Sequence, residues 1–266
     1  MTLEFMFLGS GSRGNCTVVR TDRFRFLIDL GFGLRRTTQS LSQFGLCAED
    51  LSAVVLTHTH VDHINGPMLR RLAGAGAELF CRPEHEDNLS GSVGYRMLKE
   101  YDRVRFFSDE PFELVPGVRV RPLALSHDSP GTHGFVFDFD LGASGFRFAY
   151  VADCGSSSLP HLADRLAGAD LLALEFNHDE QMELTSGRPP FLIHRVLGPA
   201  GHLSNTNAAR LLEQVKSKSL KAVVQLHLSQ ECNRPQLALE AAASVAGDIP
   251  IHQTNQYRVG PVIRID

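Results

Sequence analysis

A short apolar segment that runs directly into a histidine cluster constrains this chain more than any other feature. The segment SAVVLT at residues 52–57 reads as a buried strand, and HTHVDH follows it without a break. Side chains alternate along extended chain, so His58 and His60 point to the same side. Asp62 and His63 follow where the chain turns toward the next predicted helix. The fold therefore has to gather these side chains at one strand end.

Imidazole and carboxylate groups together are ligands for zinc, manganese or iron. Four of them in six positions exceed what one ion needs from one segment. We therefore predict two ions, one held by His58 and His60 and the other by Asp62 and His63. A pair of divalent ions is a common device for hydrolysing phosphodiesters and amides. The alternative is a polar loop that is merely rich in histidine.

Length and composition indicate an ordinary globular protein. The 266 residues contain no internal repeat, low-complexity tract or linker-like segment, so we predict one continuous domain over residues 1–266. The net charge of −4 argues against an overall basic coat for nucleic acid, but it is compatible with a local basic groove.

The cysteines and apolar runs bear on the compartment. The five cysteines are scattered and form no C-x-x-C pair, which favours a reducing compartment. The segment MTLEFMFLGSGSRGN reads as a strand and a turn rather than a signal peptide, and no apolar run approaches a membrane span. We expect a cytoplasmic protein without membrane association.

Hydrophobic periodicity predicts many short strands with helices between them. The predicted strands cover residues 3–8, 16–20, 24–29, 52–57, 77–81, 104–107, 112–115, 118–125, 134–140, 145–151, 169–176, 221–229 and 257–265. The predicted helices cover residues 34–44, 65–74, 84–100, 189–198, 204–217 and 235–246. Hairpin-like strand pairs are too many for a doubly wound parallel sheet, so we predict an α/β fold with two sheets covered by helices.

Several motifs now carry a resemblance along nearly the whole chain. HTHVDH resembles the H-x-H-x-D-H signature of the metallo-β-lactamase fold, a four-layer αββα sandwich. Asp29 in FLIDLG matches the aspartate that supports the metal loop, and His127 in LSHDSPGTHGF resembles the histidine of the third metal motif. Asp153 in YVADCG is similar to the bridging aspartate, and His227 in VVQLHLS to the last histidine.

The resemblance implies two ligand sets that share one bridging residue. The first ion takes His58, His60 and His127, and the second takes Asp62, His63 and His227. Asp153 bridges the ions, with a hydroxide between them. His133 is the alternative to His127, and a surface or core role is the alternative for Asp153 and His227.

Finer motifs resemble one branch of this superfamily. LGSGSRGNC, SHD, EFNHD, GHLSN and LSQECN are similar to the YycJ/WalJ-like proteins, which are related to RNase Z and the PhnP phosphodiesterases and associated with 5′-exonuclease activity on DNA. The family pattern SQENN is SQECN here, so Cys232 is a departure in the surroundings of the metal site.

Two further histidines are candidates for substrate contact. His202 precedes Ser204, the predicted N-cap of a helix, and resembles the H-x-S/T histidine that contacts the scissile phosphate. We assign it a catalytic role beside Asp62 and Asp153, with a capping role as the alternative. His178 in EFNHD is a candidate for substrate contact or structural hydrogen bonding.

Basic side chains are candidates for contact with the phosphates of a strand. We single out Arg13, which lies in the loop GSGSRGN near the predicted site. The other candidates are Arg35, Arg36, Arg70, Arg71, Arg188 and Arg195, each of which has a solvated surface charge as its alternative.

These features predict a dinuclear metal-dependent phosphodiester hydrolase, foremost a 5′-exonuclease on DNA that uses a metal-bridging hydroxide as nucleophile. Its cofactors would be two divalent ions of zinc, manganese or iron, and analogy with relatives suggests a homodimer. The first alternative is a small-molecule, cyclic phosphodiesterase or another metallohydrolase on the same fold. The second is a metal-binding or scaffold protein without catalysis.

Overall fold

The computed structural model describes residues 2–142 and 145–265, which fall into two compact units. The first unit comprises Met1–Arg119, Ser129–Gly131 and Asn255–Asp266, and the second comprises Val120–Asp128 and Thr132–Thr254. The C-terminal segment thus returns to the unit in which the chain begins. That the two units act as one continuous domain stays a prediction.

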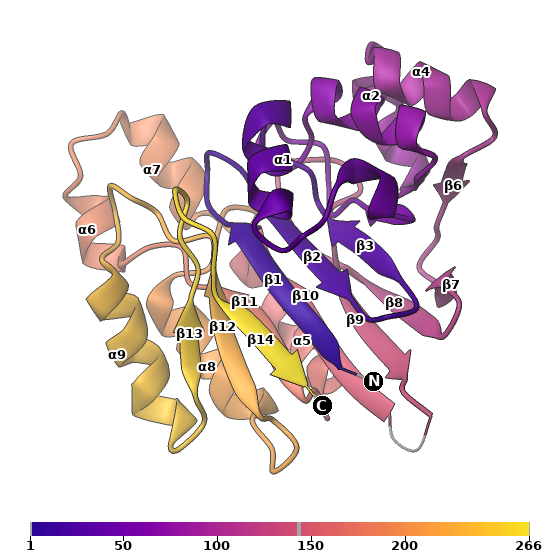
Figure 1. The fold of residues 1–266 in the computed structure, drawn as a ribbon. Helices are drawn as coiled ribbons and strands as arrows, with labels where there is room; N and C mark the ends of the chain where they lie inside the picture. The colour runs from indigo at the N-terminus through magenta and orange to yellow at the C-terminus, as the bar shows by residue number, and fades with distance from the viewer. Residues whose placement is uncertain (1, 143–144, 266) are drawn as a thin grey trace. The chain divides into compact units, whose positions relative to one another are not determined.

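The first sheet is mixed and has seven strands (Figure 1). In spatial order they are β14 (Val262–Ile265), β1 (Leu3–Gly9), β2 (Cys16–Arg20), β3 (Arg25–Ile28), β4 (Ala53–Val55), β5 (Glu78–Cys81) and β6 (Val104–Phe106). The strands from β14 to β3 pair antiparallel, and those from β3 to β6 pair parallel. The carboxyl ends of β3 and β4 therefore lie at the same edge, where the histidine cluster begins.

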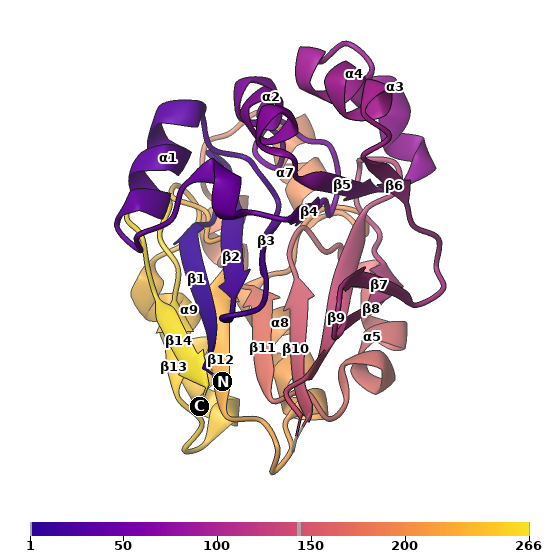
Figure 2. The ribbon, with the colours of Figure 1, turned by 45° about the vertical axis from the view of Figure 1, so that its right-hand side comes forward.

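Helices cover one face of this sheet (Figure 2). They are α1 (Leu34–Ser42), α2 (Gly66–Ala75), α3 (Glu86–Leu89) and α4 (Val93–Glu100). The start of α2 is fixed by Asn65, whose side chain accepts a hydrogen bond from the amide of Met68, and its end by Gly76 in the left-handed conformation. This capped helix directly follows the histidine cluster and limits where the cluster can turn.

The second sheet also has seven strands. In spatial order they are β13 (Ile251–Gln253), β12 (Ala222–Leu226), β11 (Leu171–Glu175), β10 (Gly145–Val151), β9 (His133–Asp140), β8 (Val118–Ala124) and β7 (Phe112–Val115). The strands from β10 to β13 pair parallel, and β9 pairs antiparallel with β10. Every residue of β11 and β12 is buried, as expected of central parallel strands.

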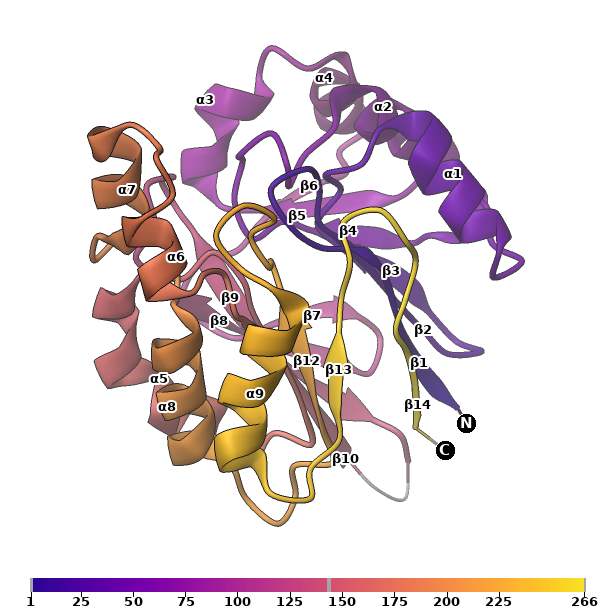
Figure 3. The ribbon, with the colours of Figure 1, turned by 90° about the vertical axis from the view of Figure 1, so that its left-hand side faces the viewer.

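Helices α5 (Leu159–Leu166), α8 (Asn205–Val215) and α9 (Pro235–Ala246) lie along one face of the second sheet (Figure 3). The chain between β11 and α8 also forms α6 (Glu180–Leu184) and α7 (Pro190–Leu197). Ser204 is the N-cap of α8, as predicted, and its hydroxyl accepts from the amide of Asn207. No helix in the described part of the chain combines the length and apolar content that crossing a membrane requires.

The structure corrects two sequence predictions and adds a strand. The predicted helix over residues 84–100 is interrupted, because the chain turns at residues 90–92 between α3 and α4. The short strand β13 was not predicted. The closing strand begins at Val262 rather than at residue 257, since Pro261 has no amide hydrogen for the ladder. Residues 255–261 consequently form a loop.

Glu4 joins three strands of the first sheet. Its carboxylate accepts from Nε of Arg20 on β2 at 2.5 Å and from Nε of Arg264 on β14 at 2.7 Å, and both arginines lie directly opposite it. Burial raises the pKa of Glu4, but the two arginines outweigh burial and lower that pKa from its usual 4.5.

Glu4→Gln should lower the free energy of unfolding by about 1 kcal/mol at neutral pH, because one exposed and one half-buried ion pair are lost. A carboxyl group with a lowered pKa contributes stability above its unfolded pKa and loses it as the pH falls through its folded pKa. The difference between wild type and variant should therefore vanish in acid. Urea unfolding at neutral pH and well below pH 4.5 checks this. An equal difference at both pH values would contradict the ionic explanation.

Candidate metal centre

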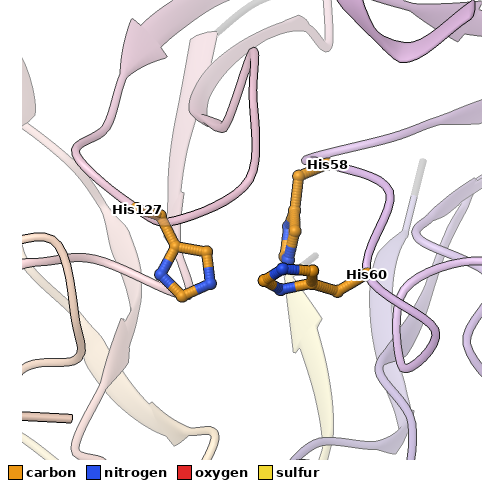
Figure 4. A group of neighbouring side chains, drawn as sticks. All are labelled: His58, His60 and His127. Carbon is orange, nitrogen blue, oxygen red and sulfur yellow. The ribbon is translucent and has the colours of Figure 1, made fainter. Parts of the chain in front are cut away.

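The histidine cluster occupies one tight turn after β4, in which the amide of His63 donates to the carbonyl of His60 at 2.9 Å. This turn brings the three rings together. The ring centroids of His58 and His60, which Figure 4 draws, are 4.8 Å apart at nearly a right angle. Those of His58 and His63 are 4.0 Å apart. His58 and His63 are fully buried. Buried histidines this close together indicate a binding site rather than a polar surface loop.

Asp29, one residue after β3, fixes the orientation of His63. Its carboxylate accepts from Nδ1 of His63 at 2.7 Å and from the amide of Thr57 at 2.8 Å. A carboxylate only accepts, so Nδ1 carries the hydrogen and Nε2 keeps the lone pair that a metal ion needs. Burial raises the pKa of Asp29, while the charge of His63 and these hydrogen bonds oppose that rise.

Asn15, at the end of the glycine-rich loop, holds the other side of the turn. Its amide nitrogen lies 2.9 Å from Nε2 of His63, and its backbone amide donates to the carbonyl of Asp62 at 2.7 Å. Gly31 permits this approach, because a Cβ there would lie 1.7 Å from the carbonyl oxygen of Asp62. The loop that contains Arg13 is thus attached to the histidine cluster.

The second unit gathers three imidazoles around Asp153, which follows β10. Oδ1 of Asp153 lies 3.8 Å from Nε2 of His127, 3.6 Å from Nδ1 of His202 and 3.5 Å from Nε2 of His227. His127, also drawn in Figure 4, leaves the loop after β8, and its Nδ1 lies 3.0 Å from the carbonyl oxygen of Gly201. That carbonyl fixes the hydrogen on Nδ1 and leaves Nε2 as an acceptor.

Glu175, the last residue of β11, contacts two of these imidazoles. Its Oε1 lies 2.7 Å from Nδ1 of His202 and 3.3 Å from Nδ1 of His227. Its Oε2 accepts from the amides of Cys154 and Leu203 at 2.8 and 3.1 Å. Glu175 is fully buried, and the four groups that its oxygens face are all donors.

These contacts shift two titrations in opposite directions. Burial by itself raises the pKa of Glu175, but the charge and hydrogen bond of His202 and the hydrogen bond of His227 outweigh it and hold that pKa at about 2. Burial lowers the pKa of His202, but the charge and hydrogen bond of Glu175 outweigh it and raise that pKa above 6.5. The pair is therefore a carboxylate and an imidazole that readily takes a second proton.

Three of the candidate residues have a left-handed backbone, which is uncommon for side chains other than glycine. They are Asp29 with φ of 59°, Asp153 with φ of 53° and His227 with φ of 54°, and each closely follows a strand. Such conformations cost about 1–3 kcal/mol and persist where the surroundings enforce them, most often at functional sites. The chain accepts this cost at three strand ends, of which two carry the predicted ligands Asp153 and His227 and one carries Asp29, which supports the metal loop.

The donor set of each unit fits divalent cations. In the first unit, Nε2 of His63 keeps its lone pair because Asp29 holds the Nδ1 hydrogen. In the second unit, Asp153, Glu175, His202 and His227 each place one ligand atom within 4.8 Å of the others. Imidazole and carboxylate donors held by a second layer of hydrogen bonds are typical of zinc, manganese and iron sites.

The remaining predicted residues have different surroundings. His133 is the buried first residue of β9, whereas His127 lies beside Asp153. His178 is 1% exposed, and burial lowers its pKa, so the ring is neutral. Arg13 is exposed on the glycine-rich loop. The roles assigned to His178 and Arg13 stay predictions.

Sequence reasoning missed Glu175, Asn15 and Asn177. Asn177 donates from its amide nitrogen to the carbonyl oxygen of His227 at 3.0 Å and so holds the backbone of that residue. The signal for Glu175 was present, because an acidic residue ends the apolar run LLALE in the same way that Asp29 ends a strand. The departure at Cys232 leaves the neighbouring Asn233 buried and hydrogen-bonded to the carbonyls of Phe176 and Asn177.

Sequence comparisons extend over most of the chain. Residues 24–227 match the family model described as beta-lactamase superfamily domain. The chain is 28% identical to Exodeoxyribonuclease YycJ of Bacillus anthracis, over 92% of this chain and 89% of that protein. It is 27% identical to Exodeoxyribonuclease WalJ of Streptococcus pneumoniae, over 98% of each. The resemblance to this branch is therefore confirmed.

Structural comparisons give the same fold. The metallo-beta-lactamase fold protein YhfI from Bacillus subtilis superposes with a TM-score of 0.69 at 17% identity, over 99% of both chains. The short form of human tRNase Z superposes with a TM-score of 0.64 at 17% identity, over 97% of this chain and 98% of that chain. The predicted fold class is confirmed.

Proposed function

The chain belongs to the beta-lactamase superfamily and is a metal-dependent hydrolase of the nuclease and phosphodiesterase type, and from this premise we propose that it is a 5′-exonuclease on DNA. The similarity to two proteins named exodeoxyribonuclease, over nine-tenths of the chain or more, supports DNA as the substrate. The fold itself hosts many reactions and does not name the substrate.

One observation carries the hydrolytic part of the proposal, namely that each unit presents a set of oriented ligands. We assign the first ion to His58, His60 and His127, the second to Asp62, His63 and His227, and the bridging position to Asp153. Asp29 supports His63 by holding its Nδ1 hydrogen, which directs Nε2 toward the ion.

Two bound divalent ions would supply a Lewis acid that lowers the pKa of water and neutralises charge on a phosphate. The protein's own residues have a different task, which is to hold ligands and move a proton. Asp153 keeps three imidazoles within 3.8 Å of one carboxylate oxygen.

His202 is the proton donor in this proposal. Glu175 fixes its Nδ1 hydrogen at 2.7 Å, so Nε2 is the atom that faces a substrate. The His202 side chain is 18% exposed while that of Glu175 is fully buried, so solvent reaches only the histidine. With its pKa raised, His202 can carry a hydrogen on Nε2 and donate it to a phosphate oxygen or to the leaving oxygen.

The proposal is tested with linear duplex DNA labelled at either the 5′ or the 3′ end, in Mn²⁺ and in Zn²⁺. The intact protein should release the 5′ label as short products while the 3′ label stays on long fragments. An Asp62→Ala/His63→Ala double variant and a chelator-treated wild type should release neither label.

A parallel assay with bis(p-nitrophenyl) phosphate distinguishes diester hydrolysis at the site from the use of DNA as the substrate. Release of nitrophenol without digestion of either DNA would assign the same residues to a smaller diester and overturn the nuclease proposal. Release of the 3′ label first would overturn the polarity alone.

A further inference from the structure

The loop before β14 contacts the glycine-rich loop that follows β1. The inference drawn from this contact rests on the proposed nuclease function. Residues 255–259 run beside the end of β1 and beside α1 (Figures 1 and 3). The amide of Ser10 donates to the carbonyl of Asn255 at 3.3 Å. Gly11, with φ of +138°, lies against Gln256, whose side chain would be 2.3 Å from a Cβ there. The two loops are therefore interlocked.

This junction is basic in a chain whose net charge is −4. Residues 5–21, 30–48 and 249–265 contain no aspartate or glutamate. The arginines of the two loops and α1 are Arg13, Arg35, Arg36 and Arg258. Within residues 2–142 and 145–265, none of these four forms an ion pair. Arg36 stacks over the ring of Phe32, whereas the charges of Arg13, Arg35 and Arg258 are left to act on a ligand.

Other arginines of the chain are neutralised and make a useful contrast. Arg71 pairs with Glu49, Arg195 pairs with Asp128, and Arg188 pairs with both Glu183 and Glu231. Three candidates for phosphate contact are thus occupied in ion pairs. The arginines of the interlocked loops differ from these three in having no acidic partner among the described residues.

An exposed aromatic ring lies within this positive surface. The ring of Tyr257 is 58% exposed, and the guanidinium carbon of Arg13 lies 5.9 Å from its centroid. Tyr257, Arg36 and Arg258 line a cavity of about 460 Å³ together with Gln39 and Gln43. Arginines that surround an exposed aromatic ring are the combination that binds single strands, because phosphates need charge and bases need a stacking face.

The same loop connects this surface to the metal ligands. Asn15, which contacts Asp62 and His63, is two residues from Arg13, so their Cα atoms are at most about 7.6 Å apart. A strand with its scissile phosphate at the histidine cluster therefore meets Arg13 and Tyr257 within a few nucleotides.

We propose that Tyr257, with Arg13 and Arg258 beside it, is a platform on which an unpaired base of the DNA substrate stacks while the phosphates of its strand meet the arginines. The platform is made by the first unit alone. It holds the strand without reading its sequence, because every base has a stacking face.

The test measures binding by fluorescence anisotropy, with EDTA present so that the DNA stays intact. The probes are labelled hexathymidylate and an abasic hexamer of equal charge. The full-length protein should bind hexathymidylate about tenfold more tightly. Tyr257→Ala should abolish this preference and Tyr257→Phe should keep it. Arg258→Ala should weaken the binding of both probes to the same extent. It should also reduce the slope of log K against log salt concentration by about 0.7.

Tyr101 provides the matched control. It is 51% exposed and lies 5.9 Å from the guanidinium carbon of Arg103, the same arrangement on another part of the first unit. Tyr101→Ala should leave the preference unchanged. A Tyr257→Ala protein that still prefers hexathymidylate, or a wild type without preference, would overturn the platform.

Hydrolysis of bis(p-nitrophenyl) phosphate in Mn²⁺ keeps the two proposals apart. Tyr257→Ala should hydrolyse this small diester at the wild-type rate and raise KM for oligonucleotides about tenfold. If wild type digests no DNA, the proposed function fails, but the binding comparison still decides the platform. If wild type digests DNA and Tyr257→Ala does so with unchanged KM, the platform fails alone.

Discussion

Replacing Asp153 with asparagine should reduce the hydrolysis of every diester by at least about a thousandfold. The side chain keeps its shape, and asparagine tolerates the left-handed backbone that Asp153 adopts at φ of 53°. What disappears is the negative charge beside His127, His202 and His227, each within 3.8 Å of one oxygen. The bound metal per chain, measured by elemental analysis, should fall together with the activity.

The chain offers a matched control for this substitution. Asp102 has the same conformation, with φ of 52°, but its side chain is fully exposed in the turn before β6. Asp102→Asn should keep activity, metal content and the thermal midpoint. An Asp153→Asn protein that binds metal and hydrolyses diesters at the wild-type rate would remove Asp153 from the site.

Glu175→Gln should cost both stability and activity, because a glutamine amide fits neither of the two faces that Glu175 serves. Oε1 faces the Nδ1 atoms of His202 and His227, and Oε2 faces the amides of Cys154 and Leu203. In one orientation the amide NH₂ meets two backbone donors. In the other it meets the imidazoles and moves the hydrogen of His202 from Nδ1 to Nε2.

Breaking a buried charged pair of this kind costs about 3 kcal/mol of unfolding free energy. Without the carboxylate charge, His202 should no longer hold a second proton near neutral pH, and the loss of this proton donor should lower kcat by about a thousandfold. Chemical unfolding of the metal-free protein and steady-state kinetics of the metal-loaded protein measure the two effects separately.

Glu183 separates a loss of stability from a loss of chemistry. It is fully buried in the same unit and pairs with Arg188 at 3.1 Å, so Glu183→Gln also breaks a buried ion pair. We expect a comparable destabilisation with kcat retained. If both variants lost kcat in proportion to stability, the positioning role of Glu175 would have to be withdrawn.

The local part of the site was readable from the sequence, whereas its supports other than Asp29 were not. His58, His60, Asp62 and His63 stand within six positions, so a single turn is enough to bring them together. Glu175 contacts His202 across 27 positions, and nothing in an apolar strand states which imidazole will meet its last residue. Contacts of this kind depend on the register of β10, β11 and β12.

The fold followed a similar rule. Central strands such as β11 and β12 are long apolar runs, and their prediction was confirmed. The strand β13 has only three half-buried residues, so its pattern is too short to recognise. Tyr257 was assigned to a strand and lies in a loop, because Pro261 delays the start of β14.

The pairing of β14 with β1 has a consequence for how the chain is made. The first unit takes its edge strand and the loop of Tyr257 from residues that follow the whole of the second unit. During synthesis the first sheet therefore stays incomplete, with one edge of β1 unpaired, until the residues after Thr254 have been translated. An unpaired strand edge is a template for association with other chains. We therefore expect the need for chaperones to be greatest between translation of β1 and translation of β14.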